Sequence, residues 1–192
     1  MSASLALARG GPIVRGSASS WAVLSACGRY RYLLGRTWDA ALPVVVWIML
    51  NPSTADHAKL DPTIRKCIGF TRRWGGGGIV VGNLFAWRAT DQAMLLAQKD
   101  PVGPWNDEAI ALALCATTRR WPAVAGWGKI HKRWDTRAAE VIRMLHGAHC
   151  IGVNDNGSPR HPLMPSYKTP RVSLVGARKN LRAGLPRGLR HV

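Results

Sequence analysis

The sequence has few acidic residues and few cysteines, and it has no long apolar run. Asp and Glu number 10 against 27 Lys and Arg, which gives a formal net charge of +17. A field of this sign attracts polyanions, and nucleic acid is the commonest of them. The four cysteines are far apart and form no CxxC or Cys-His cluster, so we expect no metal site, no cofactor and no disulfide framework. No stretch approaches the length of a membrane span.

These absences favour a single domain in a reducing compartment. Widely spaced cysteines are typical of buried thiols, and the first 20 residues lack the long apolar core of a signal peptide. We therefore expect a cytoplasmic protein that does not enter a membrane. At 192 residues and 47% hydrophobic content the chain fits one core. We expect a flexible tail over residues 1–19, one α/β domain over 20–167 and a basic tail over 168–192.

An apolar run at residues 44–50 is the clearest structural signal. It is rich in β-branched residues and is bounded by Pro43 and Asn51-Pro52, which predicts a strand buried on both faces. The carboxyl end of such a strand is where an open α/β sheet places its ligand. Asn51, Ser53 and Asp56 leave the strand at that end, either as site residues or as turn and cap residues.

A second apolar strand, predicted over residues 79–84, contains a polar residue. Asn83 interrupts the run, and a buried amide must find partners or cost free energy. Either the backbone satisfies it, or it faces a ligand that has both a donor and an acceptor. Asn can bond a nucleobase edge in this bidentate way.

Strand and helix signals alternate along the middle of the chain. Asp61-Pro62 begins a helix that ends before the four glycines at 75–78. Further helices are expected over 91–99, 106–118 and 130–146, with strands at 122–128 and 149–153. This alternation predicts a three-layer α/β/α domain with a short, mainly parallel sheet. Before it, residues 21–38 predict two strands. The second alternates Arg and Tyr over 29–32, as an exposed nucleic-acid surface or an amphipathic edge strand would.

The loops after the predicted strands bring candidate site residues to one end of the sheet. Asn51, Asn83 and His161 are expected to meet there, and His161 can donate a hydrogen bond to a developing anion. The sequence contains no Gly-x-Ser-x-Gly elbow, no Rossmann fingerprint and no Walker motif. The other site candidates are Ser53, Asp56, Asp61 and Arg88. Candidate phosphate contacts, each of which is alternatively a solvated surface charge, are Arg72, Arg73, Lys132, Arg133 and Arg160.

Six blocks of the sequence together point to a family. They are Cys27-Gly-Arg-Tyr-Arg-Tyr, Leu50-Asn-Pro-Ser-Thr-Ala-Asp, Asp61-Pro-Thr-Ile-Arg, Gly82-Asn-Leu-Phe-Ala-Trp-Arg-Ala-Thr, Trp127-Gly and His161-Pro-Leu. With these blocks the chain resembles, over about residues 20–165, the uncharacterised bacterial and phage proteins grouped as DUF1643. This family implies no activity.

Four short motifs carry a second, more distant resemblance. They are Ile48-Met-Leu-Asn-Pro-Ser, Val80-Val-Gly-Asn-Leu, Ala125-Gly-Trp-Gly and Pro159-Arg-His-Pro-Leu. In this order they are similar to motifs of the uracil-DNA glycosylase superfamily. The resemblance implies a glycosylase-like fold in which Asn51 orients the attacking water and Asn83 reads a flipped base. It also implies that His161 stabilises the departing base anion and that Phe85 or Trp87 stacks on the base.

The sequence thus predicts an enzyme that acts on a nucleobase in DNA, by glycosylase-like hydrolysis of an N-glycosidic bond. Extruding a base into a pocket of amides and aromatics, with basic flanks on the phosphates, is consistent with this composition. Two alternatives stay open: a non-catalytic nucleic-acid-binding protein of the same fold, and an enzyme that acts on a free nucleotide or small anion. The sequence leaves the strandedness of the DNA and the oligomeric state unspecified.

Overall fold

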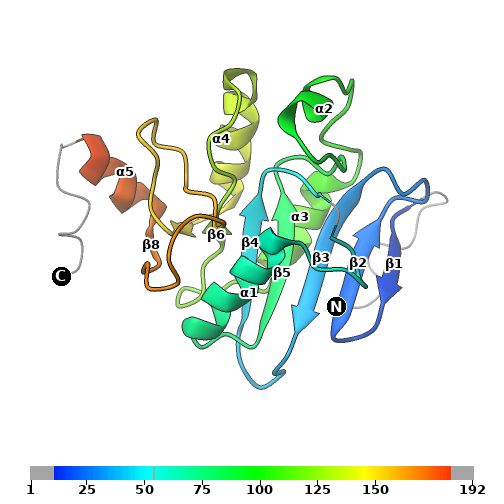
Figure 1. The fold of residues 1–192 in the computed structure, drawn as a ribbon, viewed down its shortest axis with the longest axis horizontal. Helices are drawn as coiled ribbons and strands as arrows, with labels where there is room; N and C mark the ends of the chain where they lie inside the picture. Colours follow the sequence, from blue (N-terminus) through cyan, green and yellow to red (C-terminus); the bar gives the residue numbers. More distant parts are fainter. Residues whose placement is uncertain (1–10, 54, 183–192) are drawn as a thin grey trace.

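The protein is a mixed α/β structure built on one sheet (Figure 1). The computed structural model describes residues 11–53 and 55–182. In this part of the chain eight strands form a single sheet. Their spatial order is β1 (Ile13–Gly16), β2 (Ser20–Leu24), β3 (Arg31–Thr37), β5 (Gly78–Asn83), β4 (Val44–Met49), β6 (Val124–Ala125), β7 (His149–Cys150) and β8 (Val172–Ser173).

The prediction of a mainly parallel sheet is wrong. β4 pairs in parallel with β5 and β6, and β6 pairs in parallel with β7, so the strand–helix alternation did predict a parallel centre. The pairs β1–β2, β2–β3, β3–β5 and β7–β8 are antiparallel. The N-terminal strands return through short turns without a crossover helix, which favours antiparallel pairing.

Helices cover both faces of the sheet. In the described residues they are α1 (Pro62–Arg73), α2 (Gln92–Leu96), α3 (Asn106–Leu114), α4 (Asp135–Met144) and α5 (Leu174–Arg182), with a 3₁₀ turn, η1 (Lys132–Trp134), before α4. Figure 1 shows α1 in front of the sheet and α3 behind it. Two buried clusters match this arrangement, one beneath α1 and one shared by α3, α4 and α5.

β4 contributes to both clusters because its side chains alternate between the two faces. Val46 and Ile48 pack in the cluster of α3 and α4, whereas Trp47 and Met49 pack in the cluster of α1. Trp47 also donates from Nε1 to the Thr71 hydroxyl at 3.1 Å, so its one polar atom is satisfied inside the core. A strand buried on both faces holds its carboxyl end, and the loop that follows, in a fixed place.

The predicted start of α1 at Asp61-Pro62 is confirmed. Asp61 has extended backbone angles, and its carboxylate accepts a hydrogen bond from the Ile64 N–H at 2.8 Å, with Pro62 at the first helical position. Trp74 caps the other end, and Gly75 follows with φ of 87°. A positive φ at this position suits glycine and ends the helix.

The ordered domain is wider than the predicted boundaries of 20 and 167. β1 lies in the predicted N-terminal tail and is held by antiparallel pairing with β2. β8 and α5 lie in the predicted basic tail, and Leu174 and Ala177 are buried in the core. Residues 1–10 and 183–192 of the two predicted tails lie outside the described residues. No helix of the described segments is long and apolar enough to cross a membrane.

Candidate functional site

A cavity of about 360 Å³, which we call the crevice cavity, opens at the carboxyl ends of the parallel strands. Its lining comes from β3, from the ends of β4 and β5 with the loops that follow them, from the first turn of α1, from the loop after β6 and from His161. β4 lies between β5 and β6 in the sheet. The chain crosses from β4 to β5 on one side, and after β5 it crosses back to β6 on the other side of β4. Such a point of divergence is where doubly wound α/β sheets bind ligands.

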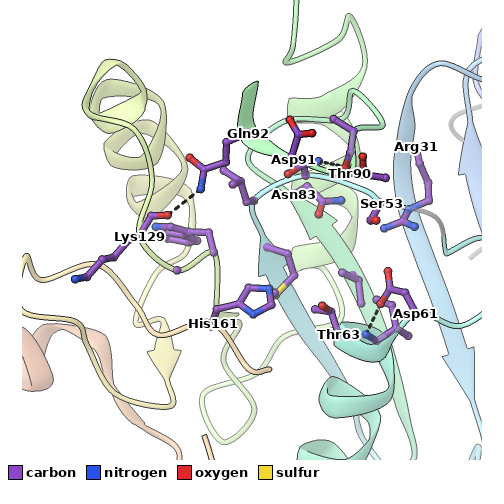
Figure 2. Close-up of a pocket in the computed structure, with 18 residues that line it drawn as sticks. Arg31, Ser53, Asp61, Thr63, Asn83, Thr90, Asp91, Gln92, Lys129 and His161 are labelled. Carbon is purple, nitrogen blue, oxygen red and sulfur yellow. Dashed lines mark hydrogen bonds between the residues drawn. The ribbon is translucent and has the colours of Figure 1, made fainter. Parts of the chain in front are cut away.

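Asn83, the last residue of β5, lies at the centre of this cavity (Figure 2). The residue is 1% exposed, and neither Oδ1 nor Nδ2 has a hydrogen-bond partner in the described structure. Its backbone carbonyl, by contrast, accepts from Asn106 Nδ2 at 3.0 Å. An unpaired buried amide costs about 1–3 kcal/mol. Its position in the lining of a cavity is typical of a group that binds a ligand with both a donor and an acceptor.

Asn51 lines the same cavity and is fixed by two backbone contacts. Its Nδ2 donates to the carbonyls of Ala89 at 2.7 Å and Pro52 at 3.1 Å. Both bonds use the amide nitrogen. Oδ1 is therefore left as an acceptor for a ligand or a water. The contact with Ala89 also joins the loop after β4 to the loop after β5.

His161 is placed in the crevice cavity by a close approach of two loops. The Gly128 N–H donates to the Pro159 carbonyl at 3.0 Å, and Gly128 has φ of 78°. A Cβ at this glycine would come within 3.2 Å of the His161 Cβ. The predicted Trp127-Gly128 motif therefore has a steric role, because a larger residue would press against the histidine.

The ring of His161 is suited to donate a hydrogen bond as a neutral group. Nδ1 accepts from the Leu163 N–H at 3.3 Å, so the proton of the neutral ring lies on Nε2. Burial lowers the pKa of His161 from its ordinary value, although Asp61 opposes this shift. Figure 2 shows the ring extending into the cavity on one side of Asn83, with Arg31 and Ser53 on the other side.

Arg31 is a site residue that the sequence did not predict. The expected alternation of exposed arginines is wrong here, since Arg31 is 2% exposed and the loop after β4 covers it. Its Nη1 donates to the Ala55 carbonyl, while Nε has no partner, and among the described residues it forms no ion pair. Burial lowers its pKa to about 10, so the guanidinium stays charged at neutral pH.

The remaining charges of the crevice cavity balance. Asp61 and Asp91 line it together with Arg31 and Lys129. Asp61 and Asp91 also cap α1 and α2, so the cap and site interpretations of Asp61 both hold geometrically. Gln92 donates from Nε2 to the Lys129 carbonyl at 3.1 Å, joining the loops that follow β5 and β6 (Figure 2).

A second cavity, of about 340 Å³, adjoins the first, and we call it the rim cavity. The two share Ser53, Ala89 and Thr90 in their linings. The predicted site residues Trp87 and Arg88 lie here, and not in the crevice cavity. A second arginine of the rim cavity, Arg29, comes from the turn between β2 and β3.

Two predicted site residues lie elsewhere. Phe85 is 2% exposed, its ring packs 5.0 Å from the ring of Trp134 in the core, and it lines neither cavity. Asp56 lines neither cavity. Burial opposes its ionisation, but backbone N–H groups of Ala58 and Lys59 outweigh this and lower its pKa. Asp56 therefore organises the loop after β4.

The candidate phosphate contacts are scattered. Arg72 and Arg73 occupy the last turn of α1, about 14 Å along the helix from the cavity-lining Thr63, so they do not flank the crevice cavity. Lys132 and Arg133 are exposed on η1, a few residues after Lys129. Arg160 donates from Nε to the Val153 carbonyl at 3.2 Å and helps to shape the loop before His161. Within the described segments no group of His, Cys, Asp or Glu could hold a metal ion.

The fold and site define a mixed α/β protein with an amide-rich crevice at the carboxyl ends of its parallel strands. Residues 31–163 match the model of a family described as proteins of unknown function, DUF1643, and the chain belongs to that family. Searches among curated proteins and among solved structures returned no match.

Proposed function

We propose that the protein hydrolyses the N-glycosidic bond of a nucleotide in DNA whose base is turned into the crevice cavity. The observation that carries the proposal is Asn83, a buried residue in the lining of the crevice cavity whose amide Oδ1 and Nδ2 have no partner among the described residues. A nucleobase edge presents an adjacent donor and acceptor, which an Asn side chain can pair with. A flipped base also leaves the helical stack and needs an enclosed pocket of this kind.

The neighbouring side chains suit the steps of such a reaction. Asn51 Oδ1 accepts a hydrogen bond from the attacking water, whose oxygen bonds to the sugar C1′ as the C1′–N bond breaks. The electron pair of that bond leaves with the base, and the proton of the water passes to solvent. His161 Nε2–H donates to the base anion, which then takes a proton from solvent. A neutral donor in a buried site stabilises a developing anion without a change in its own protonation.

The test is base release from oligonucleotides that carry uracil, hypoxanthine, mismatched thymine or a hypermodified pyrimidine. Free base is measured by chromatography, and strand lability at the resulting abasic site is measured in parallel. We expect release by the wild-type protein and a loss of about 100-fold in Asn51→Ala, because the water loses its orientation. Asn180→Ala, on α5 and outside both cavities, serves as the control.

Release by wild type and Asn51→Ala at equal rates would remove Asn51 from the mechanism. If no substrate is cleaved while DNA affinity persists in both Asn51→Ala and Asn83→Ala, the protein is a non-catalytic nucleic-acid binder.

A second candidate function, an enzyme on a free nucleotide or small anion, is favoured by Arg31. A buried guanidinium without an ion pair is costly, and an anionic group of a ligand would compensate it. Free nucleoside monophosphates on the same panel test this candidate. Their turnover, with weak DNA affinity that lacks a steep salt dependence, would favour it over the DNA-directed enzyme.

A further inference from the structure

The rim cavity differs from the crevice cavity in the sign of its charge. Arg29 and Arg88 both line it, and its lining contains no acidic residue. Neither guanidinium forms an ion pair in the described part of the chain. Arg88 Nη1 makes one long contact with the Gly28 carbonyl at 3.4 Å, and Arg29 Nε donates to the Cys27 sulfur at 3.5 Å. Two cations with such weak partners are available to an anionic ligand.

Trp87 adds a half-buried aromatic ring to this cavity. Its ring and the Tyr30 ring form a T-shaped contact, with centroids 5.2 Å apart and planes at 85°. Its backbone N–H donates to the Pro101 carbonyl at 3.1 Å, so both the chain and the ring are fixed. The Arg29 guanidinium carbon lies 5.8 Å from the ring centroid. A fixed aromatic ring beside guanidinium groups that form no ion pair is the arrangement that stacks a base and contacts the phosphates next to it.

We infer that the rim cavity binds the nucleotide that flanks the target in a single-stranded DNA segment, with Trp87 stacking on its base and Arg29 and Arg88 contacting phosphates. This inference rests on the proposed function, because it takes the strand to be anchored by a base in the crevice cavity. The two cavities are neighbours, because Ser53, Ala89 and Thr90 line both of them. Only an unpaired base presents a free face for stacking, which is why a single strand fits and an intact duplex does not.

The test measures the affinity for a fluorescein-labelled oligothymidylate by anisotropy, between about 50 and 200 mM salt. Each phosphate contact on a single strand contributes about 0.7 to the slope of log affinity against log salt. We expect Arg88→Gln to reduce the magnitude of that slope by about 0.7. Trp87→Ala should lower the affinity by about 5- to 150-fold at every salt concentration and leave the slope unchanged, because stacking involves no counterion.

Two further variants control for the fold and for the total charge. Arg29→Gln alters an exposed side chain that is not part of the core, and it should reduce the slope as Arg88→Gln does. Arg143→Gln removes the same charge from the exposed last turn of α4, outside both cavities, and should leave the slope at its wild-type value. The urea midpoint of each variant reports whether Trp87→Ala, which loses its packing on Tyr30, remains folded.

Wild-type slopes in both Arg88→Gln and Arg29→Gln would overturn the inference. If base release from the uracil or modified oligonucleotides persists in that case, the proposed function stands without the flanking site. If wild type shows neither salt-dependent binding of the oligothymidylate nor base release from any substrate, both proposals fail together.

Discussion

The two adjoining cavities differ in what they leave unpaired. In the crevice cavity the unpaired group at the centre is the neutral amide of Asn83. Arg31 Nε is also unpaired there, but Asp61 and Asp91 in the same lining offset the charges of Arg31 and Lys129. In the rim cavity the groups without strong partners are two guanidiniums, with no acid in the lining. Unpaired amides select by hydrogen-bond pattern, whereas unpaired cations bind any phosphate. Under the two proposals, the crevice cavity recognises a base and the rim cavity holds the strand.

The strongest test of this division is His161→Ala, which removes a donor from the crevice cavity only. Loss of a preorganised donor to a developing anion lowers the rate by about 100- to 1,000-fold. We therefore expect base release to fall by this factor while the affinity for oligothymidylate stays at the wild-type value. His146→Ala changes an exposed histidine outside both cavities and is the control. An equal loss of strand affinity in His161→Ala would contradict the division.

The pH dependence of base release shows whether His161 acts as a neutral or as a protonated donor. Burial lowers the pKa of His161, so its ring is neutral at pH 7 and stays so below the ordinary value of 6.5. Release should be constant at neutral pH and should fall only when the pH drops through this lowered pKa. A rate that rises in acid would instead indicate a protonated ring acting as an acid.

Burial also lowers the pKa of His149, so the unfolded chain binds extra protons below pH 6.5 and stability declines there. Urea midpoints measured at each pH distinguish this loss of stability from the loss of base release.

A smaller effect is expected from a pair of neighbouring asparagines. Asn83→Ala removes an amide that has no partner in the unliganded protein, so its stability should be unchanged or higher, while base release falls by about 5- to 150-fold. Asn106→Ala removes an amide that donates to the carbonyls of Asn83 and Leu84 at 3.0 and 3.1 Å. It should lower the free energy of unfolding by about 1–3 kcal/mol. Urea denaturation of both variants measures the contrast.

The reverse result, a large loss of stability in Asn83→Ala with release intact, would make Asn83 a structural residue. The crevice cavity would then lack the group that distinguishes it from the rim cavity.

The centre of the fold was predictable because its signals are local. The apolar runs of β4 and β5 and the Asp61-Pro62 start of α1 each lie within a few consecutive residues, and alternation with helices predicts parallel pairing. The outer pairings were not predictable in this way. All four residues of β1 are exposed, and β6, β7 and β8 are two residues each. Strands that are fully exposed or two residues long show no alternation of apolar and polar residues in the sequence. Their direction in the sheet is determined by the strands that they pair with.

Two of the candidate site residues were predictable from strand ends. Asn51 comes just after β4 and Asn83 ends β5, so both lie at the same edge of the sheet and line one cavity. His161 lines that cavity too, but it lies on the long loop after β7 and not at a strand end. Arg31 was missed because its burial depends on a loop more than 20 positions later, whose Ala55 carbonyl accepts from it. Phe85, offered by the resemblance as a stacking residue, packs on Trp134 in the core, a contact between residues far apart in the sequence. These outcomes depend on the paths of loops, which residue type and spacing do not specify.

The last and smallest effect concerns Cys27, which reports on Arg29 at the edge of the rim cavity. The hydrogen bond from Arg29, aided by one with Ser25, lowers the pKa of Cys27 to about 7. Iodoacetamide labelling of Cys27, followed by peptide mass spectrometry, should therefore show a midpoint near pH 7. The thiols of Cys67 and Cys150 are buried and should stay unlabelled in the folded protein. Burial also raises the pKa of Cys67.

Arg29→Gln should move the labelling midpoint of Cys27 to higher pH, whereas Arg143→Gln should leave it unchanged. Saturating oligothymidylate should act in the same direction as Arg29→Gln, because a phosphate that takes the guanidinium weakens its hydrogen bond to the thiolate. The shift of the labelling midpoint shows whether a ligand occupies the rim cavity, because a ligand confined to the crevice cavity does not reach Arg29. Labelling that slows with a free nucleoside as much as with the oligothymidylate would mean that the cavities respond as one site, and the distinction between base recognition and strand attachment would be lost.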